Sequence, residues 1–435
     1  MRVAVIGTGH VGLVTCVTFA AMGHDVVGTD SDGEKIESLN KGIVPFFEPG
    51  VADLLHEGFA SGRLSFVTNY ENAVPGADVV FICVGTPPRA SGEANLIAVE
   101  KAAREVARYA VGPTILAEKS TVPAGTADRL RRAIKLERPD TDELDVVSNP
   151  EFLREGNAVD DSLNPDRILV GAESDAAFET MRRLYNPLTE KGIPLIETNI
   201  RTAELAKHAC NAFLALKISY ANALSLLCER AGADVVAVTE VMGKDDRIGP
   251  QFLRAGLGYG GYCFPKDLVA FEHLASQLGY EFGLLSEVAR INEHAIGAAL
   301  DKVKDALWNL DDKRVALLGL SFKPGTDDVR LSPSLALARR LIEEGALVIG
   351  YDPAAGQEAK KDVPEIEVVE DAYDAVAGAH CVVIATEWDE FAHLDLAKVR
   401  ELMAYPVVID ARNLFDPAEM AQAGFVYYPT GRPRS

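Results

Sequence analysis

Short apolar runs and a glycine-rich turn organise the start of the chain. Residues 2–6 form an apolar run, residues 7–12 a turn with three glycines, residues 13–23 an apolar segment of helical length, and residues 24–30 a second apolar run. Short apolar runs on either side of a helical segment are typical of a β-α-β unit with parallel strands. The sequence therefore predicts that the first thirty residues form such a unit.

Similar apolar runs continue through the next hundred residues and end in small or polar residues, which extends the predicted parallel sheet. These runs occupy residues 77–85, 114–120 and 144–149. Ligands of an open parallel sheet bind outside the carboxyl ends of its strands. The segments 84–88, 118–126 and 149–156 are therefore the candidate site loops.

From Arg201 onward the spacing of apolar residues changes from that of strands to that of a helix. The apolar positions recur at steps of three and four, at Leu205, Ala209, Phe213, Leu216, Tyr220, Leu224 and Leu227. This spacing predicts one long amphipathic helix over residues 201–232. Such a helix can link two domains and pair with its copy in a dimer.

The last third of the chain repeats the alternation of apolar runs and helical segments seen in the first third. An apolar run at 313–320 precedes a helical pattern at 332–345 and a second run at 346–353 that contains Asp352. Two more runs follow, at 381–391 and 406–413. We therefore predict an α/β protein with two doubly wound, Rossmann-like parallel-sheet domains joined by the long helix.

The glycine-rich turn points to a dinucleotide. Gly7, Gly9 and Gly12 form a GxGxxG pattern between a strand and a helix, and Asp30 ends the next strand. The glycines let a pyrophosphate approach the helix N-terminus, while the carboxylate binds the ribose 2′-hydroxyl and repels a 2′-phosphate. We expect NAD rather than NADP, and the alternative is a tight turn that binds no ligand.

Charge and cysteine content exclude several classes. The 435 residues carry 43 basic and 65 acidic side chains, a net charge of −22, so a nucleic-acid partner is not expected. The six cysteines show no paired spacing, and neither a disulfide framework nor a metal site is expected. Without an apolar leader or a run of about 20 apolar residues, we expect a cytoplasmic protein that is not bound to a membrane.

One cysteine differs from the other five in its surroundings. Cys16, Cys83, Cys210, Cys228 and Cys381 lie among apolar neighbours, which predicts buried small hydrophobic side chains.

Cys263 instead lies in the segment GLGYGGYCFPKD, residues 256–267. Pro265 suits the first position of a helix, so we expect Cys263 just before a helix N-terminus, where the dipole and Lys266 favour the thiolate. The glycines would then let a substrate carbon reach the sulfur. An inert cysteine is the alternative, and Asp267 either complements the dipole or orients a water molecule.

Two pairs of polar residues remain open on chemistry alone. Lys207 and Asn211 lie four residues apart on the long helix, away from its apolar stripe, and are either an ordinary solvated pair or part of a covered second face. Lys323 and Arg330 lie in the first turn of the second α/β domain, which lacks the glycine pattern. They either hold a second nucleotide or belong to a charged surface loop.

Over its whole length, the chain resembles the UDP-glucose/GDP-mannose dehydrogenase family. The resemblance rests on VIGTGHVGL, FFEPG, CVGTP, EKSTVPAGT, NPEFLREG, AELAKHACNAFLALKIS, GLGYGGYCFPKD, FKPGTDDVRLSP, ATEWDEF and DARN, in family order. It implies an NAD-binding domain at 1–198, a central helical dimerisation domain at 199–300 and a UDP-sugar-binding domain at 301–435. The active site would lie in the cleft between the two nucleotide domains.

The family chemistry is the oxidation of a primary alcohol to a carboxylate with two NAD, and FFEPG and ATEWDEF favour UDP-glucose as the substrate. The resemblance implies that Cys263 forms a thiohemiacetal and then a thioester, which water hydrolyses. Lys207 matches the lysine that stabilises the oxyanion, and Asn211 matches its hydrogen-bonding companion. Asp267, Thr121 and Glu151 match groups that position water and move protons, and which one is the base stays open.

Binding residues follow from the same resemblance. Besides the three glycines, the implied NAD contacts are Val11, Asp30, Lys35, Thr86, Thr121, Glu155, Lys266 and Arg330. The implied UDP-sugar contacts are Phe152, Leu153, Arg154, Glu155, Lys207, Asn211, Arg247, Phe252, Leu253, Arg254, Ala255, Gly256, Gly260 and Lys323. Arg247 would reach into the neighbouring subunit of a homodimer, although a surface salt bridge is the simpler alternative.

Three alternatives remain. Single oxidations in hydroxyacid and phosphogluconate dehydrogenases need neither the cysteine nor a second nucleotide domain. A catalytically silent nucleotide-binding protein could lack Cys263, Lys207 or Asp267, all of which are present. Within the family, GDP-mannose and UDP-N-acetylmannosamine are the nearest alternative substrates.

Overall fold

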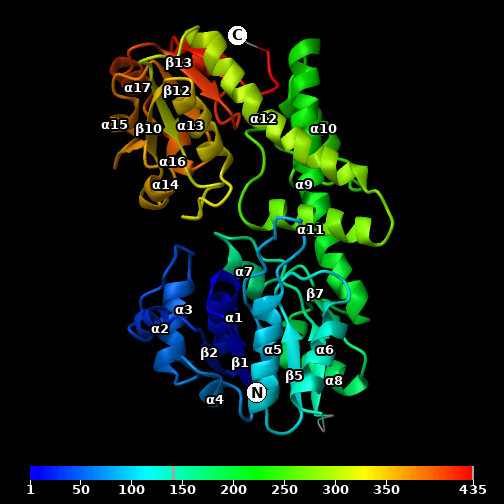
Figure 1. Cartoon of the computed structure of the whole chain (residues 1–435). Coiled ribbons are helices and arrows are strands. Elements are labelled where there is room, and N and C mark those ends of the chain that lie inside the picture. The colour runs from blue at the N-terminus through cyan, green and yellow to red at the C-terminus, as the bar shows by residue number, and fades with distance from the viewer. Residues whose placement is uncertain (140–142, 434–435) are drawn as a thin grey trace. The chain divides into compact units, whose positions relative to one another are not determined.

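A computed structural model describes residues 1–139 and 143–433 of the chain (Figure 1). It divides into two compact units. Unit 1 contains Met1–Cys210 with Val269–Tyr280, and unit 2 contains Asn211–Leu268 with Glu281–Ser435. Two helices run from one unit into the other, α9 (Ile200–Ala231) and α11 (Cys263–Gln277).

Unit 1 is built on an eight-stranded sheet of order β3-β2-β1-β4-β5-β6-β7-β8. Its strands are β1 (Arg2–Ile6), β2 (Asp25–Thr29), β3 (Leu64–Val67), β4 (Val79–Ile82), β5 (Thr114–Glu118), β6 (Leu144–Ser148), β7 (Ile168–Gly171) and β8 (Leu195–Thr198). The described pairings are parallel except for β6 with β7. The predicted parallel sheet is confirmed, and β3, β7 and β8 extend it beyond the strands predicted from the sequence.

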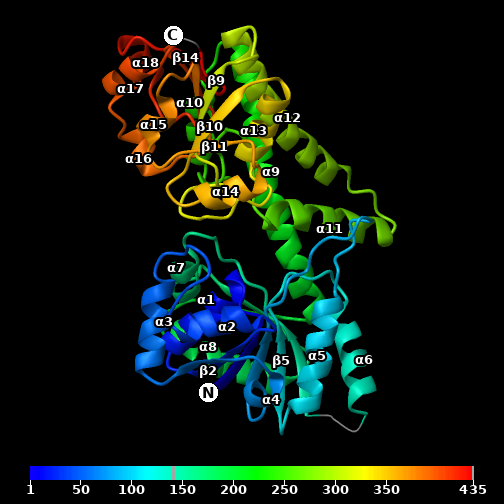
Figure 2. The same ribbon diagram turned by 60° about the vertical axis from the view of Figure 1, so that its left-hand side comes forward.

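Helices cover both faces of this sheet (Figure 2). They are α1 (His10–Ala21), α2 (Gly33–Asn40), α3 (Val51–Ala60), α4 (Tyr70–Ala73), α5 (Ile97–Tyr109), α6 (Thr126–Glu137), α7 (Ala158–Leu163) and α8 (Asp175–Thr189). Successive residues of a strand point to opposite faces, so Val3 and Val5 enter one core while Ala4 and Ile6 enter the other. A strand buried on both faces reads as a continuous apolar run, which explains the pattern at residues 2–6.

Unit 2 contains a six-stranded sheet, with described pairings all parallel, of order β11-β10-β9-β12-β13-β14. Its strands are β9 (Arg314–Leu318), β10 (Leu347–Tyr351), β11 (Glu367–Val368), β12 (Cys381–Ile384), β13 (Val407–Asp410) and β14 (Val426–Pro429). Its helices are α10 (Val235–Gly243), α12 (Gly283–Leu307), α13 (Pro333–Glu343), α14 (Gly356–Asp362), α15 (Ala372–Val376), α16 (Asp389–Ala392), α17 (Leu396–Leu402) and α18 (Pro417–Gln422). The second predicted α/β domain is therefore confirmed.

The predicted long helix is confirmed as α9, but its apolar stripe is the exposed side in the single chain. Phe213 and Leu227 are each 61% exposed. The opposite face carries Lys207 and Asn211, which are only 4% and 6% exposed. The alternative of an ordinary solvated pair is therefore wrong, because both polar residues lie on the covered face.

Among the described helices, α9 is the one whose length and composition alone would allow it to cross a membrane, since an 18-residue stretch has a mean hydropathy of 1.2. Its polar contacts are those of a core helix. Glu204 accepts hydrogen bonds from the backbone N–H groups of Gly125 at 2.6 Å and Ala127 at 2.9 Å, at the start of α6. Burial raises the pKa of the Glu204 carboxyl to about 6.

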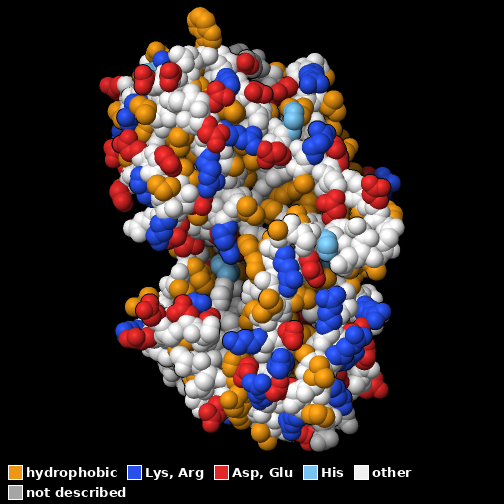
Figure 3. All heavy atoms as spheres, in the orientation of Figure 1, with side chains coloured by type: hydrophobic (Ala, Val, Ile, Leu, Met, Phe, Trp, Pro, Cys, Tyr) orange, Lys and Arg blue, Asp and Glu red, His pale blue; other side chains and the backbone are white. Residues whose placement is uncertain are grey.

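Charged side chains are interspersed over the face shown in Figure 3, with acidic and basic groups next to one another.

Four of the five cysteines expected in the core are buried. Cys210 is not: it is half-buried, and its sulfur lies 3.6 Å from a guanidinium nitrogen of Arg167. Its apolar neighbours in sequence are mostly on other faces of α9, so they do not enclose it.

Candidate active site

The glycine-rich turn of unit 1 fits a dinucleotide. A side-chain carbon on Gly7 would lie 2.7 Å from the carbonyl oxygen of Cys83, and one on Gly12 would lie 1.8 Å from that of Gly7. Neither position therefore has room for a side chain: Gly7 lies against the residue that follows β4, and Gly12 lies against the turn itself. Gly9 instead has no atom within 4 Å of such a carbon, and as the N-cap of α1 it provides no side-chain cap. Open space in front of uncapped N–H groups is what a pyrophosphate requires.

Asp30 lies at the carboxyl end of β2 and is tied to this turn. One carboxylate oxygen accepts hydrogen bonds from the backbone N–H of Thr8 at 2.9 Å and from Lys35 at 2.9 Å. Burial alone would raise the pKa of Asp30, but these hydrogen bonds outweigh it and hold the pKa below its usual range. The carboxylate is therefore ionised at neutral pH, the state in which it would repel a 2′-phosphate.

The loops after β4 and β5 meet through Thr86, whose hydroxyl donates to the carbonyl oxygen of Thr121 at 3.0 Å. Both threonines were predicted from the sequence as cofactor contacts. The structure thus brings together two of the three candidate site loops of unit 1. Val11 is partly buried against the core that α1 covers.

The third loop follows β6 and reaches Lys207 of α9. The ammonium group of Lys207 lies 3.2 Å from a carboxylate oxygen of Glu151 and 5.3 Å from the ring centroid of Phe152. Both partners of the ion pair are almost completely buried. A buried ammonium beside one carboxylate is a preorganised positive charge, suited to stabilising a developing oxyanion.

Arg167 was missed by the sequence analysis. Its guanidinium carbon lies 4.0 Å from the ring centroid of Phe152, so this ring packs against two cations. Arg167 lies just before β7, a strand that was not predicted, and nothing in the sequence connects it with Phe152.

The remaining residues of the third loop have partners close by in the sequence. Arg154 donates to both carboxylate oxygens of Asp161, so an ion pair joins the loop to α7. The backbone N–H of Leu153 donates to Glu151 at 3.0 Å. Glu155 completes the segment and is half-buried.

Cys263 is exposed and is the first residue of α11. The helix therefore begins two residues earlier than expected, and Pro265 is its third residue rather than its first. A proline is tolerated anywhere in the first turn, because the N–H groups there have no partner within the helix. The correction leaves Cys263 at the positive end of the helix dipole.

One turn further along α11, Asp267 holds two donors. Its carboxylate accepts hydrogen bonds from the side-chain amide of Asn211 at 2.6 Å and from the ammonium group of Lys266 at 2.5 Å. All three residues are buried. Asp267 therefore does more than complement the helix dipole, since it links α9 to α11 within unit 2.

Tyr262 was also missed by the sequence analysis, although it lies within the segment 256–267. Its ring centroid lies 5.7 Å from the ammonium group of Lys266 and 4.7 Å from the guanidinium carbon of Arg330. Arg330 also pairs with Asp328 at 2.6 Å. Lys323, in the same turn after β9, has its ammonium group 5.6 Å from the ring of Phe322.

The glycines before Cys263 have a different role from the one expected. A side-chain carbon on Gly260 would lie 2.5 Å from the carbonyl oxygen of Leu331, and one on Gly256 would lie 2.6 Å from that of Ala411. Such a carbon would meet the chain itself and not open space, so these glycines allow the loop to pack against other segments of unit 2. The idea that they clear a path to the sulfur is not supported at these two positions.

The rest of the predicted substrate loop is largely internal. Leu253 and Ala255 are buried, Arg254 is exposed, and Phe252 has a positive φ of 64°. Arg247 lies nearby in sequence and is 88% exposed, with its guanidinium 2.6 Å from Asp245. In the single chain, Arg247 therefore forms a surface salt bridge, which was the simpler alternative to a contact with a neighbouring subunit.

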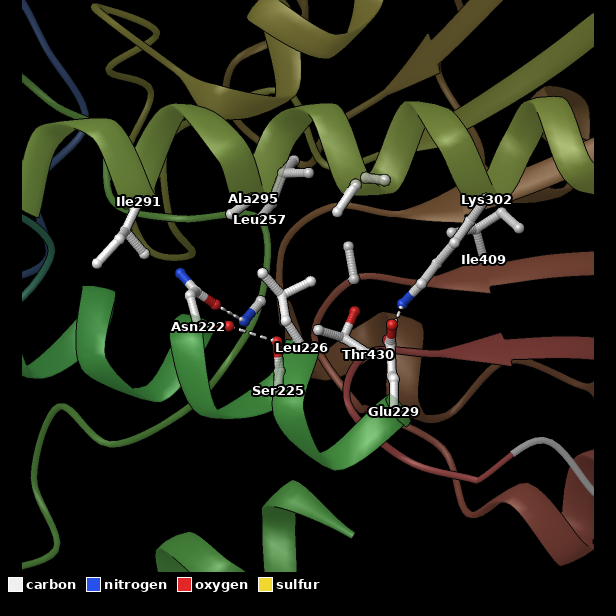
Figure 4. A pocket seen from close by; sticks show the side chains of 14 residues that line it. Asn222, Ser225, Leu226, Glu229, Leu257, Ile291, Ala295, Lys302, Ile409 and Thr430 are labelled. Atoms are coloured by element: carbon white, nitrogen blue, oxygen red, sulfur yellow. Dashed lines mark hydrogen bonds and ion pairs between the residues drawn. The ribbon is translucent and has the colours of Figure 1, made fainter. Parts of the chain in front are cut away.

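A small cavity, with about 20 Å³ of space open to a water-sized molecule, lies elsewhere in unit 2 (Figure 4). Apolar side chains of α9 and α12 line it, and the ion pair of Glu229 and Lys302, at 2.5 Å, borders it. Of the predicted substrate residues, Gly256 alone lines this cavity. Its backbone N–H donates a hydrogen bond to the side-chain oxygen of Asn222 at 2.7 Å. The cavity is therefore separate from Cys263 and Asp267.

Comparison with known proteins covers nearly the whole chain. Residues 1–189 match the NAD binding domain of the UDP-glucose/GDP-mannose dehydrogenase family, residues 201–294 its central domain, and residues 316–417 its UDP binding domain. These three matches follow one another in the same order as the domains predicted from the sequence.

Individual relatives are similar over their full length. The UDP-glucose 6-dehydrogenase of Rhizobium meliloti (strain 1021) is 45% identical over 437 residues, covering 100% of both chains. That of Bacillus subtilis (strain 168) is 43% identical, covering 99% of this chain and 98% of the relative.

Solved structures are similar in the same way. A UDP-glucose dehydrogenase from Pyrobaculum islandicum has a TM-score of 0.93 and 39% identity, over 99% of this chain and 98% of the other. A UDP-D-ManNAc dehydrogenase from Pyrococcus horikoshii has a TM-score of 0.87 and 29% identity, over 99% of each chain.

Proposed function

Because this chain belongs to the UDP-glucose/GDP-mannose dehydrogenase family, we propose that it oxidises C6 of UDP-glucose to the carboxylate of UDP-glucuronate, with NAD as the cofactor. The observation that carries the proposal is the set of polar groups around α9 and the start of α11. A buried ammonium, an amide and a carboxylate lie on the same two helices as an exposed thiol. Full-length relatives that bear the name UDP-glucose 6-dehydrogenase support the choice of substrate.

Unit 1 would hold the cofactor at the N-terminus of α1, in front of Gly9, with Asp30 at the ribose. When bound, NAD supplies the hydride acceptor, and the two oxidations consume two molecules of it. The hydrogen bond between Thr86 and Thr121 holds the loops after β4 and β5 together, so these loops need no rearrangement to bind the cofactor. Lys35 holds the Asp30 carboxylate in place.

The thiol of Cys263 is assigned the covalent step. The C6 alcohol first loses a hydride and its hydroxyl proton, and the thiol then adds to the aldehyde so that a C–S bond forms and the carbonyl oxygen is protonated. Loss of a second hydride and of the hydroxyl proton converts this thiohemiacetal into a thioester. Water then cleaves the C–S bond, which releases the carboxylate and returns the thiol. Sulfur suits both roles, as a good nucleophile and a good acyl leaving group.

Charge on α9 would stabilise the oxygen at C6. Lys207 is buried, so its ammonium acts in a low dielectric and loses little energy to reorganisation. Asn211 lies one turn further along α9, and Asp267 fixes its amide, which leaves that amide oriented before substrate binds. Glu151 and Asp267 are the two carboxylates available to move protons, through water or directly.

The UDP-sugar would contact the segment 152–155 of unit 1 and, in unit 2, the loop 252–256, Gly260 and Lys323. We place the protein in a homodimer built on the apolar face of α9, since Phe213, Tyr220 and Leu227 are half or more exposed and recur along one side of the helix. Arg247 of one subunit would leave Asp245 and reach the substrate of the other.

The experiment is a turnover assay on a panel of nucleotide sugars with NAD. UDP-glucose should give two NADH for each UDP-glucuronate, whereas UDP-N-acetylmannosamine and GDP-mannose should be oxidised poorly. One NADH per sugar with free aldehyde as the main product would exclude the covalent route. Better turnover of GDP-mannose or UDP-N-acetylmannosamine would replace the substrate but keep the chemistry.

The arginine is tested separately, by mixing two inactive variants. Arg247→Ala should raise the KM for UDP-glucose far more than that for NAD. Heterodimers of Arg247→Ala with Cys263→Ala should regain part of the activity, because one of their sites keeps both native residues. Verified heterodimers that stay inactive would show that each subunit uses its own arginine.

A further inference from the structure

Glu48 of unit 1 connects two segments that are far apart in the sequence. One oxygen of its carboxylate lies 2.7 Å from Nε2 of His10 and accepts the backbone N–H of Gly156 at 2.6 Å. The other oxygen accepts the backbone N–H of Ala158 at 2.8 Å. One side chain thus reaches the start of α1 and the residues before and at the start of α7.

Burial makes these contacts important. The side chain of Glu48 is 0% exposed, and a buried carboxylate must be matched by hydrogen-bond donors or a positive charge. His10 provides the side-chain partner, and its ring is held by stacking on Phe46, with 4.4 Å between centroids. Removal of either partner would leave a buried polar group unsatisfied, which costs more than the net worth of the bond.

The two connected segments are those assigned to different ligands. His10 directly follows Gly9, where the cofactor would bind, and Gly156 directly follows the substrate segment 152–155. Apolar packing supports the link from Glu48 to α7, because Val51, three residues after Glu48, and Ala158 belong to one buried core. Polar and apolar contacts thus both tie the segment around Glu48 to the start of α7.

We propose that Glu48 and His10 are positioning residues that couple the cofactor turn to the substrate segment, so that each ligand strengthens the binding of the other. The inference rests on the proposed function, which assigns NAD and the UDP-sugar to these two segments. Ordering of the turn by the cofactor orients His10, which holds Glu48, and Glu48 holds Gly156 and Ala158. Because coupling between two binding sites is reciprocal, the effect must be equal in both directions.

Binding of NADH with and without UDP-glucose tests the inference, since this pair cannot react. In the wild type, saturating UDP-glucose should tighten NADH binding by at least about fivefold, within the usual range of coupling between sites. In Glu48→Gln the factor should fall below about twofold. His10→Phe, which keeps an aromatic ring for stacking on Phe46, should do the same and serves if Glu48→Gln does not fold.

His24→Gln is the matched control. His24 is buried in the same unit, with Nε2 2.9 Å from the carbonyl oxygen of Leu184, and touches neither segment. It should lower stability and keep the wild-type coupling factor. Wild-type coupling in Glu48→Gln or His10→Phe, loss of coupling in His24→Gln, or a wild type that binds both ligands independently would each overturn the inference. A wild type that fails to bind UDP-glucose or NADH would instead refute the proposed function.

Discussion

Replacement of Asp267 by asparagine tests the polar centre of unit 2 most directly. The native carboxylate accepts hydrogen bonds from Asn211 on one oxygen and from Lys266 on the other. In Asp267→Asn one of these oxygens becomes an amide nitrogen, which can only donate. Either the Asn211 amide or the Lys266 ammonium then faces another donor.

The size of the effect follows from burial. Asp267 is 1% exposed and Lys266 8%, so the variant leaves a buried ammonium without its counter-ion. Breaking a buried ion pair by removing one partner costs about 3–5 kcal/mol. Loss of the hydrogen bond that orients Asn211, a bond to a charged group worth about 1.5–3 kcal/mol, corresponds to a decrease in kcat of roughly 10- to 100-fold.

Urea unfolding and steady-state kinetics on four proteins provide the assay: the wild type, Asp267→Asn, Lys266→Met and the double variant. The double variant should lose less stability than the sum of the two single variants, by at least about 1 kcal/mol, because no unpaired charge remains. Its kcat should recover part of the loss seen in Asp267→Asn, since the amide oxygen at position 267 no longer pairs with Lys266 and can accept from Asn211. Additive losses of stability, or a single variant with wild-type stability and kcat, would refute this reasoning.

Three further predictions concern other groups. Cys263→Ala should bind UDP-glucose and NAD normally but form almost no UDP-glucuronate, while Cys263→Ser should accumulate a mass expected for an acylated serine; near-normal product from Cys263→Ala would make the cysteine structural. The wild type should have a higher kcat/KM with NAD than with NADP, and Asp30→Ala should narrow this gap, so equal use of both cofactors by the wild type would contradict the role of Asp30. The pKa of Glu204 is raised from 4.5 to about 6, so its contribution to stability is fully present below pH 4.5 and is lost as pH rises through 6. The stability of the wild type relative to Glu204→Gln should thus fall by about 2 kcal/mol between pH 4 and pH 7, measured by urea unfolding, and a pH-independent difference would show that burial does not perturb this carboxyl.

Local chemistry is what the sequence alone determined. The apolar runs predicted most strands of both sheets, because strands covered on both faces must be apolar throughout. Steps of three and four predicted α9 to within one residue at each end. Gly7, Gly12 and Asp30 were identified because a tight turn and a ribose contact each accept few residue types.

Tertiary structure decided which residues meet and which faces are covered. The apolar stripe of α9 predicted the helix and a face able to pair with a second copy, but it did not predict that Lys207 is buried on the opposite face. Apart from Lys266, the neighbour of Asp267, the partners described for Lys207, Asp267 and Glu48 come from segments dozens of residues away or more, and no local spacing encodes such contacts. The glycines before Cys263 were misinterpreted for the same reason: sequence shows that a side chain is absent, but only the packed fold shows which atoms occupy the space that it leaves.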